Sequence, residues 1–579
     1  MNNVWNSDAI TNNIVSQKEI KPHMRAILID WLFEVANCYE FPNSYVHRAV
    51  KILDIVISKY QLKTNDMQLL GCAILSIIDH YFSRFSIDYK KWMKISDNCF
   101  NADQLFTMQY TVLNILDWNV FHKTYYDVIR EADIKSRQLY VILADYLLYF
   151  PTSSSYDINQ VAHLIIKIID GGLLDEDSLD ENNRQEHSSL DENTIINDIL
   201  YLFIRLCPLT DDKNHLISKY AKHFIKTNKM TLESEDFIKI LTRLNQTKSI
   251  SASDSPTISD NRLRNSVSSS DTPVVLPDLT DMISIEHTEF LKVKFLNKLG
   301  EGTYGQIYSA NYADQNYALK KFINCDGKIE DSTIREIVAL KKIKSPNVIG
   351  CFKVIVDRDN TLCMLTQRCN MDLYRWITKY YEFSKVKSII QDIINGLFDI
   401  HAQGFIHRDL KPQNILLYYD KQSLDETSSH CQAKICDFGI STHVDIYHDK
   451  KEEPYDMYTL WYRSPELLLG AAPNSKTSDI WALGCVIYEL IMGKPLMTGD
   501  SNFDQLFGIF KIFGTTPDIH MKHLPNYKST LPKYKVTEKI KDEIGDKLNA
   551  NQLRILMRMF DYDLSQRITI EDIKLNWMV

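Results

Sequence analysis

The segment that decides the fold is His407-Arg-Asp-Leu-Lys-Pro-Gln-Asn414, because it gathers a carboxylate, two cations and two amides within a short stretch. Upstream lies Gly300-Glu-Gly-Thr-Tyr-Gly305, whose glycines stand between two strand-like runs. Downstream come Asp437-Phe-Gly439 and Thr459-Leu-Trp-Tyr-Arg-Ser-Pro-Glu466. Each segment alone could be a turn or a solvated charge. Together, in this order, they indicate one functional site.

These segments resemble, in the same order, the sequence motifs of protein kinases. Glu330-Asp-Ser-Thr-Ile-Arg-Glu336 resembles Pro-Ser-Thr-Ala-Ile-Arg-Glu, the signature of the cyclin-binding helix in cyclin-dependent kinases. Gly499-Asp-Ser-Asn-Phe-Asp-Gln-Leu-Phe507 and Gly514-Thr-Thr-Pro517 also match that subgroup. The resemblance implies a two-lobed α+β kinase fold with short strands first and helices later. It also implies ATP and Mg²⁺ as cofactors.

The resemblance further implies roles for four charged residues. Lys320 would hold the α- and β-phosphates, and Glu336 would pair with its ammonium group. Asp409 would accept the proton of the substrate hydroxyl. Lys411 would compensate charge on the γ-phosphate. We therefore expect these residues to form the catalytic set.

The nucleotide and the metal ions would be held by residues around this set. Glycines without side chains let backbone amides approach the phosphates, Ile307 would cap the adenine, and Asp372 would meet the ribose. Mg²⁺ would be held by Asn414 and Asp437. The expected nucleotide-binding residues are Leu299, Gly300, Glu301, Gly302, Thr303, Tyr304, Gly305, Gln306, Ile307, Lys320, Gln367, Cys369 and Asp372.

Thr303 and Tyr304 would also be sites of control, since kinases of this type are inhibited by phosphorylation at such positions. An added charge of about −1.5 to −2 over the phosphates would repel ATP. The alternative is that both are plain loop residues.

A second control site involves two arginines and two glutamates. Related kinases gather an activating phosphothreonine with three arginines, of which Arg335 and Arg408 are present here. The third position is Thr442, and Glu452 and Glu453 lie beside the position of the missing phosphothreonine. Their carboxylates could occupy the arginine cluster permanently. A solvated acidic loop, or a role for a nearby tyrosine, is the alternative.

Far upstream, Met24-Arg-Ala-Ile-Leu-Ile-Asp-Trp-Leu-Phe-Glu-Val35 is a helical pattern that is apolar nearly all round. It resembles the opening helix of an A- or B-type cyclin box, which implies an all-α fold of two tandem helical bundles. Arg25 would pair internally with Asp54, as a buried arginine requires. The outer side would bind Arg-x-Leu peptides, unless the helix is simply a core helix. The expected docking residues are Met24, Ile27, Leu28, Trp31 and Gln68.

The cyclin-like part departs from its relatives at two positions. Cyclins use a lysine and a glutamate to grip the backbone near the kinase signature helix, and His80 and Gln109 occupy those positions here. A tether of about 40 residues, spanning roughly 35 Å as a coil, would give a millimolar effective concentration and could compensate for a weaker contact. The alternative is a cyclin part that no longer docks and only recruits substrates.

The composition is that of a soluble globular protein, with 45% hydrophobic and 24% charged residues. A formal net charge of −9 argues against non-specific binding of nucleic acid. The 11 cysteines are scattered without metal-ligand spacing, which favours reduced thiols inside the cell. No apolar run approaches the ~20 residues that span a bilayer. We expect a soluble intracellular protein of the cytoplasm, the nucleus or both.

These observations predict a multidomain chain. We expect an N-terminal extension over 1–23, a cyclin box over 24–122, a second helical bundle over 123–246 with an acidic insert near 173–194, a Ser/Asp-rich linker over 247–288, and a kinase domain over 289–579.

The expected function is that of a cyclin-dependent serine/threonine kinase activated by its own fused cyclin. We expect an intramolecular cyclin–kinase contact and cell-cycle or transcription-type substrates with Ser/Thr-Pro sites. The alternative is a non-catalytic decoy or scaffold that binds cell-cycle partners.

Overall fold

The computed structural model describes residues 17–83, 86–124, 127–128, 289–302, 305–323, 329–419, 431–444, 459–471, 475–515 and 518–577. The chain divides into two compact units. One comprises Met1–Leu75, Ile95–Asn98 and Phe121–Asp281, and the other Ser76–Lys94, Cys99–Val120 and Met282–Val579. Almost all of the predicted second helical bundle, and all of the acidic insert and the linker, lie outside the described residues.

The first unit is helical where it is described, with α2 (Pro22–Cys38), α3 (Asn43–Lys59) and the start of α4 (Met67–Phe82). Pro22 stands at the start of α2, where its fixed φ suits the helix and its missing N–H is not needed. Helix α3 is buried on nearly all sides and packs against α2. Arg25 of α2 lies 2.7 Å from Asp54 of α3, and both side chains are buried, which confirms the predicted ion pair.

The second unit begins with the end of α4, followed by α5 (Tyr89–Ile95) and α6 (Ala102–Ile115). Helix α6 starts at a capping box, in which Asn101 and Gln104 accept each other's backbone N–H groups. Within the described residues, no helix is both long and apolar enough to cross a membrane.

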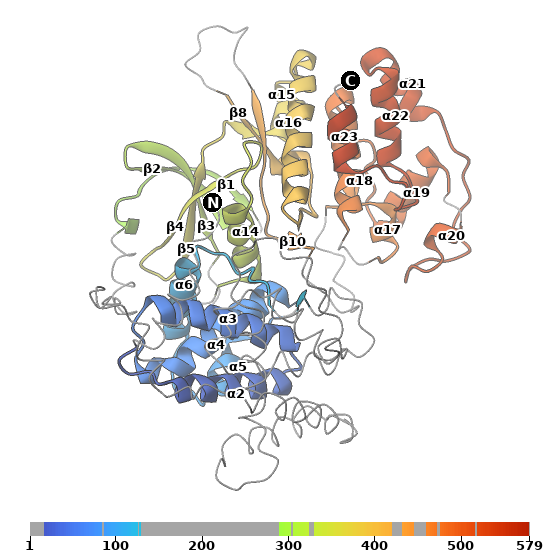
Figure 1. The fold of residues 1–579 in the computed structure, drawn as a ribbon. Coiled ribbons are helices and arrows are strands. Elements are labelled where there is room, and N and C mark those ends of the chain that lie inside the picture. Colours follow the sequence, from blue (N-terminus) through green and yellow to red (C-terminus); the bar gives the residue numbers. More distant parts are fainter. Residues whose placement is uncertain are drawn as a thin grey trace, which may run out of the picture. The chain divides into compact units, whose positions relative to one another are not determined.

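A five-stranded antiparallel sheet follows in the same unit (Figure 1). Its strands are β1 (Lys294–Gly302), β2 (Gly305–Tyr312), β3 (Gln315–Phe322), β4 (Cys351–Val356) and β5 (Leu362–Gln367), in the order β1-β2-β3-β5-β4. One face buries Val293, Ala310, Leu319 and Leu365. Helix α14 (Asp331–Lys342) packs on β4 through buried apolar residues. This packing places α14 close to β3, which belongs to the same sheet.

The remaining part is mainly helical, as Figure 1 shows in yellow to red. Two small sheets pair β6 (Met371–Asp372), β8 (Ile415–Tyr418) and β9 (Gln432–Ile435), and β7 (Phe405–Ile406) with β10 (Thr442–His443). Its other elements are α15 (Leu373–Lys379), α16 (Phe383–Ala402), η4 (Pro412–Asn414), η6 (Leu460–Tyr462), α17 (Pro465–Leu468), α18 (Lys476–Met492), α19 (Asn502–Phe513), α20 (Asp518–Met521), α21 (Lys539–Ile544), α22 (Ala550–Met559) and α23 (Ile570–Asn576).

Helix α18 is the buried centre of this part. It packs against α16 and α22, and Trp481 lies edge-on to Phe513 and Phe560. The order of a helical region, then a sheet, then a helical part confirms the predicted fold class for the described residues.

Candidate active site

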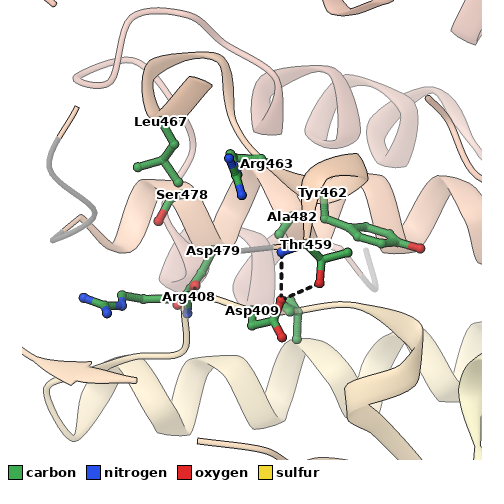
Figure 2. Close-up of a pocket in the computed structure, with 10 residues that line it drawn as sticks. Arg408, Asp409, Thr459, Tyr462, Arg463, Leu467, Ser478, Asp479 and Ala482 are labelled. Carbon is green, nitrogen blue, oxygen red and sulfur yellow. Dashed lines mark hydrogen bonds between the residues drawn. The ribbon is translucent and has the colours of Figure 1, made fainter. Parts of the chain in front are cut away.

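The carboxylate of Asp409 is held from several sides between β7 and η4. Lys411 Nζ donates to Asp409 Oδ2 at 2.6 Å, and Thr459 Oγ1 donates to Asp409 Oδ1 at 2.9 Å. Lys411 Nζ also lies 2.7 Å from Thr459 Oγ1. Figure 2 shows Thr459 facing Asp409 in a pocket that Arg408, Arg463 and Asp479 also line. This geometry presents a fixed, half-buried carboxylate beside a cation.

The loop that carries Asp409 is anchored by Asp479, near the start of α18. Asp479 is 1% exposed, and its two carboxylate oxygens accept the backbone N–H groups of His407 and Arg408, both at 2.8 Å. His401 Nε2 contacts the same carboxylate at 2.9 Å. Arg408 has φ +71°, a left-handed conformation that is costly for a residue with a side chain. The two hydrogen bonds that Asp479 accepts therefore hold a strained backbone in place.

Asp479 remains ionised in this position. Burial alone would raise the pKa of its carboxyl group, but the hydrogen bond to His401, the nearby His407 and the N–H of Arg408 outweigh burial and lower the pKa. We did not predict Asp479 from the sequence. The sequence shows only a single acidic residue at the start of a long apolar helix. Carboxylates are common in the first turn of helices without any functional role.

Lys320 of β3 and Glu336 of α14 form a buried ion pair. Lys320 Nζ lies 2.8 and 2.6 Å from the two carboxylate oxygens of Glu336, and 3.9 Å from Asp437 Oδ1. Burial opposes a charged ammonium group, yet the carboxylates of Glu336 and Asp437 raise the pKa of Lys320. The structure thus brings together the three charged residues expected at the phosphate end of a nucleotide site.

Asn414 and Asp437, the expected metal-holding residues, present oxygen atoms near Asp409 and Lys320. Asn414 Nδ2 donates to the backbone oxygen of Asp409 at 2.9 Å and to Oδ2 of Asp409 at 3.0 Å. This orientation leaves the amide oxygen of Asn414 available to a cation. The side chain of Asp437 is 32% exposed. Mg²⁺ is commonly bound by one or two protein oxygen ligands together with substrate phosphates. The carboxylate of Asp437 and the amide oxygen of Asn414 are suitable ligands of this kind.

The expected nucleotide-binding residues divide into two groups. Leu299, Gly300, Glu301 and Gly302 lie on β1, and Gly305, Gln306 and Ile307 begin β2. Thr303 and Tyr304 lie outside the described residues. Gln367 ends β5, Cys369 follows it, and Asp372 caps α15 by accepting the N–H of Arg375 at 2.8 Å.

Gly305 is the one glycine of this loop that packing requires. A Cβ atom there would lie 2.4 Å from the backbone oxygen of Lys321, whereas Gly300 and Gly302 face open space. The register pairs Gly305 with Phe322, so any side chain would separate β2 from β3. A larger residue would displace the strand that carries Lys320.

Residues from α4 and α6 contact α14 and β4 within the second unit. His80 Nδ1 lies 2.5 Å from Asp331 Oδ1, and Ser86 Oγ donates to the same oxygen at 3.0 Å. Tyr110 Oη lies 3.4 Å from the backbone oxygen of Val354, and Lys341 Nζ lies 2.9 Å from Asp117.

Gln109, which stands at the second of the two positions that depart from cyclins, has its hydrogen-bond partners on α4 and α5. It is fully buried and bonds to Ser76 Oγ at 2.7 Å and to the hydroxyl of Tyr89. The amide of Gln109 is therefore satisfied by these neighbours of α4 and α5.

The two arginines of the expected control site have other partners in the described residues. Arg335 contacts Asp331 at 3.7 Å and the backbone oxygen of Ser83 at 3.5 Å. Arg408 Nε donates to the backbone oxygen of Ile440 at 2.7 Å. Thr442 is buried. Glu452 and Glu453 lie outside the described residues.

The expected docking residues of the first unit differ in exposure. Ile27 is 53% exposed, Met24, Trp31 and Gln68 are half-buried, and Leu28 is buried. A Cβ atom on Gly71 would lie 2.8 Å from Leu28 Cδ1, which shows how closely Leu28 packs on α4.

Comparisons with known proteins identify both parts of the chain. Residues 293–578 match the protein kinase domain family, and residues 3–121 match the cyclin N-terminal domain family. The chain therefore combines a region that matches protein kinase domains with a region that matches cyclin N-terminal domains. This chain contains a cyclin N-terminal domain and a protein kinase domain in one polypeptide, as predicted.

A solved structure of the CAK complex from Chaetomium thermophilum bound to ATP-gamma-S contains a similar chain. The two chains are 24% identical, with a TM-score of 0.45, over 52% of this chain and 94% of that chain.

Proposed function

We propose that this chain is a serine/threonine protein kinase of the cyclin-dependent type, which uses ATP with Mg²⁺ and is activated in cis by its own cyclin domain. One observation carries the proposal. The Lys320–Glu336 pair is formed at 2.6 Å while α14, the helix that carries Glu336, is contacted by residues of α4 in the same chain. Kinases of this type need that pair in place to act.

The proposed chemistry assigns one task to each charged group. Lys320 orients the α- and β-phosphates, and its pairing with Glu336 fixes where its ammonium group lies. Asp409 accepts the proton of the substrate hydroxyl as the oxygen attacks the γ-phosphate. Lys411, 2.6 Å from Asp409, compensates the developing charge. Bound Mg²⁺ would neutralise phosphate charge from Asn414 and Asp437.

The proposed substrates are proteins with Ser/Thr-Pro sites, of the cell-cycle or transcription type, which would place the activity in the cytoplasm or nucleus. The exposed side chain of Ile27, with half-buried Met24, Trp31 and Gln68, supports binding of Arg-x-Leu peptides on α2. Buried Leu28 would then form the floor of that surface.

A phosphorylation assay on the purified chain tests the proposal. With ATP, Mg²⁺ and a Ser-Pro peptide, we expect phosphoserine to form, and we expect chelation of Mg²⁺ to stop the reaction. Asp409→Asn keeps the shape of the side chain but removes its basicity, so it serves as the control. If the chain and the Asp409→Asn variant are equally inactive, the decoy alternative is favoured.

A further inference from the structure

Asp331, the first residue of α14, is the centre of a buried polar cluster in the second unit. Its Oδ1 atom contacts His80 Nδ1 at 2.5 Å and accepts from Ser86 Oγ at 3.0 Å. Its Oδ2 atom lies 3.7 Å from Arg335, one turn along the same helix. Asp79 lies beside His80 in the sequence and has a buried carboxylate that accepts the N–H of Ile87 at 2.6 Å.

The contact between His80 and Asp331 is the better shielded of the two ion pairs in the described residues that join the α4–α6 region to α14. The side chain of His80 is 4% exposed and that of Asp331 23%. The pair of Lys341 with Asp117 is less shielded, because Asp117 is 82% exposed and water screens it. The Tyr110 bond to Val354 is long at 3.4 Å. A shielded, charge-assisted contact fixes the position of α14 more strongly than an exposed ion pair or a long hydrogen bond does.

Capping of α14 does not explain Asp331. The N-cap residue is Glu330, whose side chain makes no capping bond. Asp331 could favour the helix dipole from its first turn, but that effect does not require a histidine beside it. His80 Nε2 is buried with no partner in the part of the chain that the structure describes. Burying an unpaired nitrogen costs free energy. The contact of His80 Nδ1 with Asp331 is the interaction that offsets this cost.

We infer that His80 and Asp331 are positioning residues for phosphoryl transfer, and that their contact holds α14 where Glu336 reaches Lys320. Both residues act at one end of α14, and Glu336 lies further along the same rigid helix. His80 stands where the resemblance places the cyclin lysine, and here it contacts a carboxylate of α14 itself. The inference rests on the proposed function and adds to it the residues by which cis activation is exerted.

The sharpest test compares His80→Asn with His80→Gln in the full chain. The amide nitrogen of asparagine can occupy the place of Nδ1, whereas that of glutamine reaches the place of Nε2. We expect His80→Asn to keep kcat/KM within about threefold of the unaltered chain, and His80→Gln to lower it about tenfold or more. Equal activities of the two variants would overturn the inference.

Asp331→Asn supplies the second arm, with Glu330→Gln as its matched control. Both remove one negative charge at the start of α14, but only Asp331 contacts His80. We expect Asp331→Asn to lower kcat/KM about tenfold in the unaltered chain and only about twofold beside His80→Gln, because the contact is already lost there. Glu330→Gln should change kcat/KM by less than about twofold. If the effects of Asp331→Asn and His80→Gln on kcat/KM are fully additive, Asp331 acts only through the helix dipole and the inference is overturned.

Hydrogen exchange separates this inference from the proposed function. The amides of Ile334–Lys342 should exchange faster in His80→Gln than in His80→Asn, at equal melting temperatures. That difference can be measured even if the chain has no kinase activity. An inactive chain with the difference would remove the proposed function and keep the contact, whereas an active chain without it would remove the contact's positioning role.

Discussion

Thr459 and Asp479 are the residues that determine how Asp409 is presented, and neither belongs to the catalytic set expected from motifs. Thr459 reaches Asp409 from beyond a long stretch of chain, and Asp479 reaches the backbone of the same loop from α18. Both act through hydrogen bonds that a carboxylate accepts, and such bonds are stronger than bonds between neutral groups. Single-residue changes should therefore separate the two effects.

Thr459→Val keeps the shape of the side chain and removes the hydroxyl that donates to Asp409. A hydrogen bond to a charged group contributes about 1.5–3 kcal/mol, so we expect kcat to fall about tenfold to a hundredfold. Thr459→Ser retains the donor and should keep most of the rate. Steady-state kinetics on both variants checks this. Equal rates for Thr459→Val and Thr459→Ser would show that the hydroxyl does not hold the base.

Asp479→Asn should lower both activity and stability. An amide offers one acceptor oxygen, so either the N–H of His407 or that of Arg408 loses its partner, at about 1–3 kcal/mol. Because the pKa of Asp479 is lowered in the fold, its stabilisation is present above the unfolded pKa near 3.9 and is lost as pH falls below it. The melting-temperature gap between the two proteins should shrink below about pH 4. A gap that stays constant down to pH 2 would argue against this ionised anchor.

At the scale of elements, buried charges fix how neighbouring helices and strands pack. The pair of Arg25 with Asp54 joins α2 to α3 at 2.7 Å with both side chains buried. Asp54→Asn would leave the guanidinium without its counter-charge, which we expect to cost about 3–5 kcal/mol. Replacing both residues, as Arg25→Met with Asp54→Leu, should recover most of the loss. Urea denaturation measures this, and a double variant no more stable than Asp54→Asn would contradict it.

Glu289 fixes the entry of the chain into β1. Its carboxylate accepts from Lys353 Nζ at 2.6 Å, from Tyr312 Oη at 2.5 Å and from Lys292 Nζ, and these bonds lower its pKa to about 2. The stabilisation is present above the unfolded pKa near 4.3 and is lost as pH falls toward 2. Solvent screening keeps the effect of Glu289→Gln small, below about 1 kcal/mol. Melting curves of the two proteins should differ most at pH 7, less at pH 3 and hardly at all at pH 2.

For the whole molecule, the sequence is most informative where site residues are contiguous. Glycines, Lys320, Asp409, Asn414 and Asp437 stand in short segments with fixed spacing, so their types and order are visible before folding. The contacts of Asp479 and Thr459 depend on residues far away in the chain. Asp479 is a single carboxylate without a distinctive pattern, and the motif that begins at Thr459 does not reveal which group its hydroxyl contacts. Their positions follow only from tertiary packing.

For Gln109 and His80 the sequence identified the positions but not the hydrogen-bond partners. The resemblance to cyclins places both at positions that differ from those of relatives, but it does not say which partners they contact. An amide can be satisfied by any nearby hydroxyl, and Ser76 and Tyr89 satisfy Gln109. His80 contacts Asp331, a carboxylate that this chain carries at the start of its signature helix. The fold class was predictable from periodicity and resemblance, whereas partner choice among polar side chains was not.

The most direct test of cis activation is the specific activity of the full chain over a dilution series without added cyclin. An activator in the same polypeptide acts at an effective concentration that dilution does not change. We predict that the rate per molecule stays constant from micromolar to low nanomolar protein, is abolished by Asp409→Asn, and does not rise when free cyclin is added. A rate per molecule that falls with dilution, or activity that appears only with added cyclin, would contradict the account.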